Sequence, residues 1–233
     1  MNKREEDYIK TIYTLTVEEK AKLANTQVVA NTLEVTIQTA NEMFKKLAKQ
    51  DLVVYKPYKG VRLTEKGITE AIRVIRAHRI IELFLTETLN FKWSEVYEDA
   101  ERLEHAASVK LVDALYEFLG RPKTDPHGHP IPVFGEEYKI STLNLFALNK
   151  NDGFKIIMVN ESDDVFNYFD NNKIKIADDF VVEYKDENAI TIKSDRRYQI
   201  SKNIAVNIFV EKLKKEKWKN EKETLANIRW RNR

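Results

Sequence analysis

Hydrophobic and polar positions along the first 90 residues follow the order helix, helix, helix, two short strands, helix. Tyr8, Ile12 and Leu15 keep helical spacing on the opening helix, and Thr26 begins a short second one. Thr36 is a residue type that caps helices, so a third helix is predicted after it. The apolar face of that helix comprises Ile37, Ala40, Phe44 and Leu47. This order predicts a winged helix-turn-helix.

The run LVVYKPYKGVRLT contains two β-rich stretches around a tip at residues 56–60, which is the candidate wing. A long helix from about Thr64 to Leu89 should follow, and then a single helix capped by Ser94 and ending at Gly120. One apolar stripe runs along this last helix through Val96, Ala100, Leu103, Ala107, Leu111, Leu115 and Phe118. Two such helices per chain predict a homodimer interface.

A proline- and glycine-rich loop, RPKTDPHGHPIPVFG, indicates a domain boundary. Beyond it, strands are predicted at residues 154–159, 173–176, 180–184, 189–192 and 204–210, with a short helix at 165–169. The predicted fold class is mainly α with a small β-barrel. The predicted domains are a winged helix-turn-helix at 1–70, a helical metal-binding and dimerisation domain at 71–140, a β domain at 141–212 and a basic tail at 213–233.

The composition narrows the possible chemistry. The chain has no cysteine, which excludes disulfides, thiolate nucleophiles and cysteine-based metal sites. The N-terminus is charged, and no apolar run approaches the roughly 18 residues of a membrane span. We therefore expect a cytoplasmic protein without a membrane partner, in which any metal is bound by oxygen and nitrogen.

The distribution of charge is uneven along the chain. Residues 1–66 carry 12 Lys and Arg against 9 Asp and Glu, whereas residues 67–140 carry 9 against 13. The segment from residue 211 onward carries 9 against 4. A basic head, an acidic middle and a basic tail suit a protein that binds a polyanion and cations, although scattered surface charge would look similar.

The third helix and the wing hold the candidate DNA-binding residues. Amide and small polar side chains early on a recognition helix read base edges, while nearby lysines and arginines contact phosphates. The candidates for base contacts are Gln38, Thr39, Asn41 and Glu42, and those for phosphate contacts are Lys45, Lys46, Lys59 and Arg62. The expected partner is double-stranded DNA with a palindromic operator.

Hard metal ligands cluster in the acidic segment. Glu101, Glu104 and His105 have the spacing i, i+3, i+4, which predicts that they share one helix face. His78 and Glu82 form a similar pair on the preceding helix. Further candidates are Asp7 on the opening helix and Asp125 with His127 in the boundary loop. Each alone is more often a solvated side chain, but three of the four histidines lie beside carboxylates. Carboxylates and imidazoles without sulfur favour manganese(II) or iron(II), with zinc left open.

The order of helix-turn-helix, wing, HRIIELFL, AERLEH and PHGHPIP resembles the diphtheria toxin repressor family of metalloregulators, over nearly the whole chain to about residue 210. It is most similar to the manganese-responsive branch with a third, SH3-like domain. The resemblance implies a primary metal site of Asp7, Glu101, Glu104 and His105 with His78. Iron-responsive members carry methionine and cysteine in place of Asp7 and Glu101, so the oxygen ligands favour manganese.

The resemblance also implies a second metal site, formed by Glu82, His127 and an acidic residue among Glu161, Asp163 and Asp164, of which Asp163 is the chosen candidate. Asp125 stands where relatives often have cysteine, so it is a further candidate ligand. Lys10 stands where some manganese sensors have a glutamate, so their two-metal cluster does not carry over directly.

These features predict a manganese-dependent transcriptional regulator that represses metal-uptake genes when metal is bound. The alternatives are an iron-responsive member of the family and a metal-independent winged-helix regulator. A metal-dependent hydrolase is the rival from another class, but the chain has no HExxH motif, no glycine-rich phosphate loop and no nucleophile motif. We therefore expect neither an enzyme nor a small organic substrate.

Overall fold

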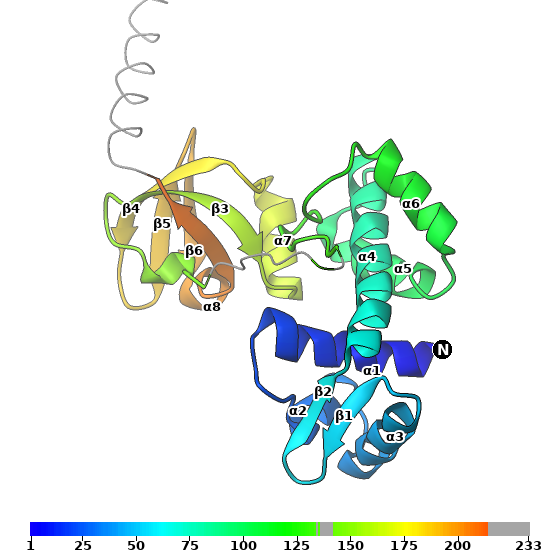
Figure 1. Ribbon diagram of the computed structural model, residues 1–233. Coiled ribbons are helices and arrows are strands. Elements are labelled where there is room, and N and C mark those ends of the chain that lie inside the picture. Colours follow the sequence, from blue (N-terminus) through cyan, green and yellow to red (C-terminus); the bar gives the residue numbers. More distant parts are fainter. Residues whose placement is uncertain (134, 136–141, 214–233) are drawn as a thin grey trace, which may run out of the picture. The chain divides into compact units, whose positions relative to one another are not determined.

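The computed structural model describes residues 1–133, 135 and 142–213 of the 233-residue chain. These residues form two compact units (Figure 1). The first contains residues 1–90, 96–125, 130–133 and 135, and the second contains 91–95, 126–129 and 142–213. The predicted basic tail at 213–233 lies, from residue 214 onward, outside the described residues. Among the described helices, none has the length and apolar character needed to cross a membrane.

The first unit begins with the predicted winged helix-turn-helix. Its elements are α1 (Lys3–Tyr13), a π-helical turn (Thr14–Glu18), α2 (Thr26–Thr32), α3 (Ile37–Lys49), β1 (Val53–Lys56) and β2 (Gly60–Leu63). It continues through α4 (Glu65–Glu87), α5 (Trp93–Leu103), whose first residues belong to the second unit, and α6 (Val109–Phe118).

Capping residues define where these helices begin. Asn2 and Glu5 form a capping box at the start of α1, which satisfies backbone N–H groups that have no partner within the helix. Thr36 accepts a hydrogen bond from the backbone of Thr39, so the predicted cap of α3 is confirmed. Thr64 caps α4 in the same way. These three helices therefore begin where local side-chain chemistry favours a start.

One apolar core joins α1, α3 and the first half of α4. Tyr8, Ile12, Phe44 and Leu47 are buried there together with Ala71 of α4. The tyrosine and phenylalanine rings meet edge-on, with centroids 6.0 Å apart. Because α1 contributes its apolar face to this core, its polar side chains are held in fixed directions toward α3, α4 and the end of α5.

The wing depends on one glycine. β1 and β2 pair antiparallel, with Lys56 opposite Gly60. Gly60 has a φ of +124°, and a Cβ at this position would lie 2.5 Å from the carbonyl oxygen of Ala24. Only glycine fits both requirements, which allows β2 to pair with the segment before α2 through a bridge between Ala24 and Val61.

The predicted single helix from Ser94 to Gly120 is wrong, because the structure contains two helices there. α5 ends at Leu103, and the hydroxyl of Ser108 accepts a hydrogen bond from the backbone of Leu111 to cap α6. The apolar spacing continues across the break, so periodicity could not reveal it.

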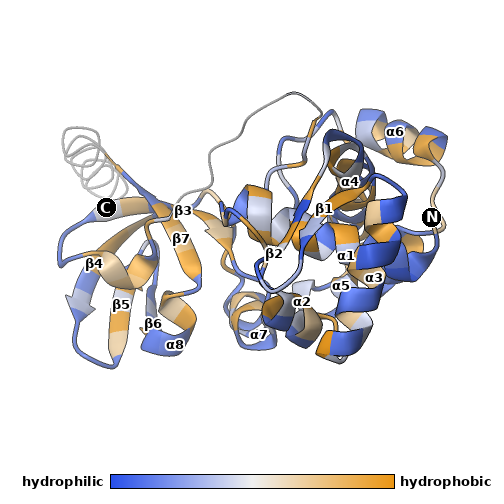
Figure 2. Cartoon of the chain, turned by 60° about the horizontal axis from the view of Figure 1, so that its bottom comes forward, coloured by the Kyte–Doolittle hydropathy of each residue, from blue (hydrophilic) through white to orange (hydrophobic). Residues whose placement is uncertain are grey.

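The second unit is built on a five-stranded antiparallel sheet of order β6-β5-β4-β3-β7. Its elements are β3 (Gly153–Val159), α7 (Asp163–Asn172), β4 (Asp179–Lys185), β5 (Ala189–Lys193), β6 (Arg197–Ser201), α8 (Lys202–Ala205) and β7 (Ile208–Lys212). Along β5 and β6, buried residues alternate with more exposed ones, as expected for strands with one face on a core. In Figure 2, which colours residues by hydropathy, apolar residues are seen on β5 and β7 of this sheet. Phe154, Ile156, Phe169, Phe180 and Ile192 lie in that core.

Two strand predictions in this unit are wrong. No strand forms at residues 173–176, where Lys173 takes a left-handed conformation with φ +53° and ends α7. The predicted strand at 204–210 divides into the end of α8 and the start of β7. β6 was missed, although Tyr198 and Ile200 alternate with polar residues as a strand requires.

Candidate metal centre

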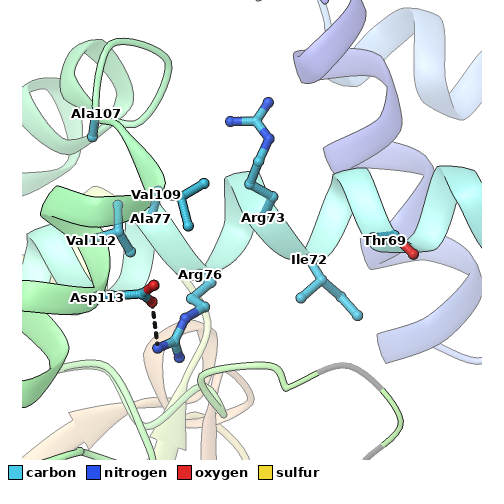
Figure 3. A pocket seen from close by; sticks show the side chains of 9 residues that line it. All are labelled: Thr69, Ile72, Arg73, Arg76, Ala77, Ala107, Val109, Val112 and Asp113. Carbon is cyan, nitrogen blue, oxygen red and sulfur yellow. Dashed lines mark hydrogen bonds and ion pairs between the residues drawn. The ribbon is translucent and has the colours of Figure 1, made fainter.

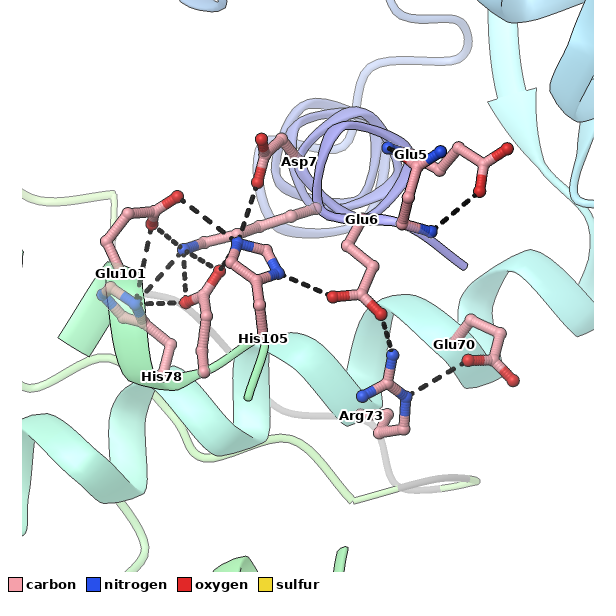
Figure 4. A network of polar contacts seen from close by, with 11 residues as sticks. Glu5, Glu6, Asp7, Glu70, Arg73, His78, Glu101 and His105 are labelled. Atoms are coloured by element: carbon pink, nitrogen blue, oxygen red, sulfur yellow. Dashed lines mark hydrogen bonds and ion pairs between the residues drawn. The ribbon is translucent and has the colours of Figure 1, made fainter. Parts of the chain in front are cut away.

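Three segments of the first unit bring the predicted primary ligands together (Figure 4). Asp7 lies on α1, Glu101 on the last turn of α5, and Glu104 with His105 directly after it. One ligand atom from each of these four residues lies within 4.8 Å of the others. The expectation that 101, 104 and 105 share a helix face needs correction, because α5 ends at Leu103 and the last two ligands occupy the turn that follows.

The atoms of this cluster are arranged as ligands for a cation. The Nε2 atom of His105 lies 3.0 Å from Asp7 Oδ1, 3.3 Å from Glu104 Oε1 and 3.8 Å from Glu101 Oε1. Nε2 of His105 and Oδ1 of Asp7 are buried without a hydrogen-bond partner among the described residues. Unpartnered buried polar atoms are costly, and a bound divalent cation would satisfy both. Three carboxylates and one imidazole suit manganese(II), iron(II) or zinc.

A neighbouring carboxylate orients the histidine. Nδ1 of His105 lies 2.6 Å from Oε2 of Glu6, and since an ionised carboxylate only accepts, Nδ1 is the donor. Arg73 donates to the other oxygen of Glu6 and also to Glu70, at 3.2 Å. In the neutral imidazole, this chain of bonds puts the lone pair on Nε2, the atom that faces Asp7. Sequence reasoning missed Glu6, and only its position next to Asp7 hinted at it.

His78 lies beside the cluster but contacts different atoms. Its Nδ1 is 2.5 Å from Glu104 Oε2 and 3.2 Å from the ammonium of Lys10, while its Nε2 is 3.2 Å from Oε1 of Glu82. Burial works against the charged form, yet Glu82 and Glu104 raise the pKa of His78 to about 10. His78 thus contacts Lys10 and Oε2 of Glu104, and no described contact joins it to Asp7.

The carboxylates differ in their electrostatic surroundings. Burial raises the pKa of Asp7 above its ordinary value. Burial acts in the same direction on Glu101, but the ammonium of Lys10 outweighs it and holds the pKa of Glu101 below its ordinary value. Glu101 thus already has a compensating cation, whereas Asp7 would gain one from a metal.

The predicted second ligand set is divided between the two units. In the first unit, Glu82 is fully buried and Asp125 lies 3.6 Å from Nε of Arg79. In the second, His127 is fully buried and stacks on Phe166 with ring centroids 4.4 Å apart. This second metal site stays a prediction.

The acidic candidates of the second unit lie at the start of α7. Asp163 and Asp164 occupy its exposed first turn, and Glu161 precedes it. Glu161 Oε1 lies 3.9 Å from Nδ1 of His129, a residue that the sequence reasoning did not select. The repeated histidine in HGH was the available signal. Gly128 between the histidines has a φ of +90° and approaches Ile157 so closely that no side chain would fit.

Most of the predicted DNA-binding residues lie on the surface of the winged helix. The exposed ones are Gln38, Thr39, Glu42, Lys45, Lys46, Lys59 and Arg62. Asn41 is half-buried, and its side-chain oxygen accepts a hydrogen bond of 2.7 Å from the hydroxyl of Tyr55. Lys46 also pairs with Glu5 of α1, at 3.0 Å. Sequence reasoning missed Tyr58, which is fully exposed at the wing tip.

A second surface feature is an apolar groove of about 190 Å³ between α4 and α6 (Figure 3). Ala77, Val109 and Val112 line it, and Arg76 closes one side through an ion pair with Asp113 at 3.4 Å. On α6 the apolar side chains of Val109, Leu111 and Phe118 are exposed. Exposed apolar side chains grouped on one helix are typical of an interaction surface.

The fold and the ligand cluster together define a metal-binding winged-helix protein. Comparison with known families agrees: the model of the iron dependent repressor N-terminal DNA binding domain matches residues 1–61, and that of the iron dependent repressor metal binding and dimerisation domain matches residues 64–133. The chain therefore belongs to the iron-dependent repressor family, which includes the diphtheria toxin repressor. This is a family of metal-dependent DNA-binding transcriptional repressors and not of enzymes, so the predicted family and the predicted absence of enzyme activity are confirmed.

Individual relatives extend this assignment. An uncharacterised HTH-type transcriptional regulator of Methanocaldococcus jannaschii is 36% identical over 53% of this chain and 98% of that protein. The iron-dependent repressor IdeR of Mycobacterium tuberculosis is 33% identical over 54% of this chain and 54% of its own length. The match thus spans about half of IdeR.

Solved structures resemble nearly the whole chain. The manganese regulator SloR is 34% identical with a TM-score of 0.69, over 90% of this chain and 98% of that one. A manganese-dependent transcriptional repressor in complex with manganese is 29% identical with a TM-score of 0.77, over 89% and 99%. ScaR with bound cadmium is 29% identical with a TM-score of 0.72, over 91% and 100%. The predicted fold class, including the SH3-like C-terminal region, is confirmed.

Proposed function

We propose that this protein is a manganese(II)-responsive repressor that acts in the cytoplasm and silences metal-uptake genes when manganese is bound. The observation that supports this proposal most directly is the cluster of Asp7, Glu101, Glu104 and His105, in which three of the four ligand residues offer oxygen. Hard oxygen ligands without sulfur suit manganese. The solved structures named above as manganese-dependent or as manganese regulators support the same metal.

A bound cation would neutralise the carboxylates and connect α1 to the end of α5. This connection would also affect the recognition helix α3, because α1 contacts it directly. Oε1 of Glu5 accepts a hydrogen bond of 2.9 Å from Gln50, just after α3, and lies 3.0 Å from the ammonium of Lys46. The position of α1 thereby fixes the position of α3, so metal binding and DNA binding become linked. Such coupling is reciprocal and typically amounts to about 1–3 kcal/mol.

The DNA partner would be a palindromic operator read by a homodimer. The exposed apolar side chains of Val109, Leu111 and Phe118, together with the groove between α4 and α6, are the proposed dimer surface. In a symmetric dimer of winged helices, the two recognition helices enter major grooves about 34 Å apart. Holding α1 and α3 in place would set this spacing.

The test is fluorescence anisotropy of metal-stripped protein on a palindromic promoter fragment at fixed salt. Manganese, anaerobic iron(II) and zinc are titrated separately into wild type, Glu104→Ala and Glu98→Ala. Glu98 is the matched control, because it lies on α5 but pairs only with exposed Arg102 among the ion pairs described. We expect manganese to tighten DNA binding about 5- to 150-fold in wild type and in the control, but not in Glu104→Ala.

Other outcomes favour the alternatives. A stronger response to iron(II) than to manganese would support an iron-responsive repressor. DNA binding that ignores every metal would support a metal-independent winged-helix regulator and refute the proposed linkage.

A further inference from the structure

The ammonium of Lys10 lies inside the cluster of metal ligands. It is 2.8 Å from Glu101 Oε2, 2.8 Å from Glu104 Oε2, 3.1 Å from Glu104 Oε1 and 3.2 Å from Nδ1 of His78. The side chain of Lys10 is 20% exposed, and that of Glu104 is fully buried. Three side chains thus surround one positive charge with little water nearby, which is how proteins hold a buried ion.

The two glutamates are shared between two neighbouring positions for a cation. Oε1 of Glu101 faces His105 at 3.8 Å, while its Oε2 contacts Lys10. Glu104 places Oε2 at 2.8 Å from Lys10, while its Oε1 lies between the two positions, 3.3 Å from Nε2 of His105 and 3.1 Å from Lys10. One position is completed by Asp7, the other by His78. Carboxylates that bridge two adjacent cations are characteristic of sites with two metal ions.

We infer that Lys10 is a built-in cation that fills the second of these positions, so that the cluster accepts a single divalent ion. This inference rests on the proposed metal-binding function. The charges support it: His78 and Glu82 form a pair of their own, which leaves Asp7, Glu101 and Glu104 with three negative charges that one ammonium and one divalent ion balance.

The ammonium of Lys10 forms ion pairs with Glu101 and Glu104, each at 2.8 Å. Replacing Lys10 by glutamate would leave four carboxylates, which two divalent ions balance. The residue at position 10 therefore sets whether the cluster binds one metal ion or two.

The experiment compares full-length wild type with Lys10→Glu after metal stripping. Bound manganese is counted by equilibrium dialysis and elemental analysis, and electron paramagnetic resonance reports whether the ions are isolated or coupled. Paired metal ions in proteins lie roughly 3.5–4 Å apart, which is close enough for magnetic coupling. We expect an isolated-ion spectrum for wild type. Lys10→Glu should bind one more manganese per chain and show a coupled pair.

Two further variants complete the test. Lys22→Glu makes the same charge change at an exposed lysine of the first unit and should bind as many ions as wild type. Lys10→Met removes the ammonium without adding a ligand, and should bind the extra ion at least tenfold more weakly than Lys10→Glu. Circular dichroism with and without manganese shows that each variant is folded.

The outcomes separate this inference from the proposed function. A coupled pair in wild type, or a folded Lys10→Glu that binds no additional ion, would overturn the role of Lys10 while leaving a manganese site in place. Absence of bound manganese from wild type and every variant would instead overturn the proposed function.

Discussion

Replacing Glu6 with glutamine should weaken manganese binding although the residue itself is not a predicted ligand. Glu6 accepts from Nδ1 of His105 at 2.6 Å with one oxygen, and from Arg73 with the other. Glutamine has only one oxygen, so its NH₂ group must face one of these two donors. Either the histidine loses the partner that fixes its tautomer, or the arginine loses a buried contact and pulls the side chain away.

The expected size follows from the general effect of residues that orient a metal-binding histidine. Removing such a partner costs about 10- to 100-fold in metal affinity, which corresponds to roughly 1.4–2.7 kcal/mol. Because Glu6 is only 5% exposed, water cannot replace it readily, and the loss should not be smaller than tenfold. The effect should appear in the affinity and not in the number of manganese ions bound.

Isothermal titration of metal-stripped protein with manganese at pH 7 measures this. Glu70→Gln is the matched control, because Glu70 also accepts from Arg73, at 3.2 Å, but has no described contact with His105. We expect its manganese affinity to stay within about twofold of wild type. If folded Glu6→Gln bound manganese as tightly as wild type, Glu6 would not orient the histidine and this reasoning would be refuted.

Three predictions concern stability. Hydrogen bonds, of which the one from the backbone of Asn2 has the largest effect, lower the pKa of Glu5 from 4.5 to about 2. The stabilising contribution of Glu5 is therefore complete above pH 4.5 and is lost as the pH falls toward 2. Between these pH values the free energy of unfolding in urea should fall by up to about 3 kcal/mol more in wild type than in Glu5→Gln. Gly67→Ala would place Cβ 1.9 Å from the carbonyl oxygen of Leu52, and should lower the unfolding free energy by about 1–3 kcal/mol in thermal melts; an unchanged melting temperature would contradict this. Phe44→Ala empties a fully buried position beneath the recognition helix and should cost about 3–5 kcal/mol in urea titrations, whereas a loss below 1 kcal/mol would show that the core collapses to fill the space.

The winged helix could be predicted because its local signals agree. Thr36 and Thr64 are cap residues placed directly before apolar helical patterns, and both act as caps. The break between α5 and α6 could not be predicted in the same way. Ser108 is an equally good cap, but it lies within an uninterrupted apolar stripe, and the stripe was the stronger signal.

The sequence predicted which residues belong to the ligand cluster better than it predicted how they are arranged. The spacing of Glu101, Glu104 and His105 and the family resemblance identified residues that the structure brings together with Asp7. Their contacts depend on tertiary packing, since Lys10 of α1 lies 91 positions before Glu101 of α5 along the chain. The ammonium of Lys10 among these carboxylates could not be read from spacing within any one helix.

The period of α1 explains how one short helix can connect metal to DNA. Successive residues of an α-helix are about 100° apart, so Asp7 and Lys10 lie within about 60° of each other, whereas Glu5 lies about 200° from Asp7. The structure uses these directions: Asp7 and Lys10 meet the residues at and after the end of α5, and Glu5 meets Lys46 and the residue after α3. A shift of α1 toward the metal cluster must therefore also displace Glu5 relative to Lys46 and Gln50, which join α1 to the region of α3. Breaking that link with Glu5→Gln should reduce the effect of manganese on DNA affinity while leaving manganese affinity in the absence of DNA unchanged. Loss of both together would mean that Glu5 acts on the metal cluster itself.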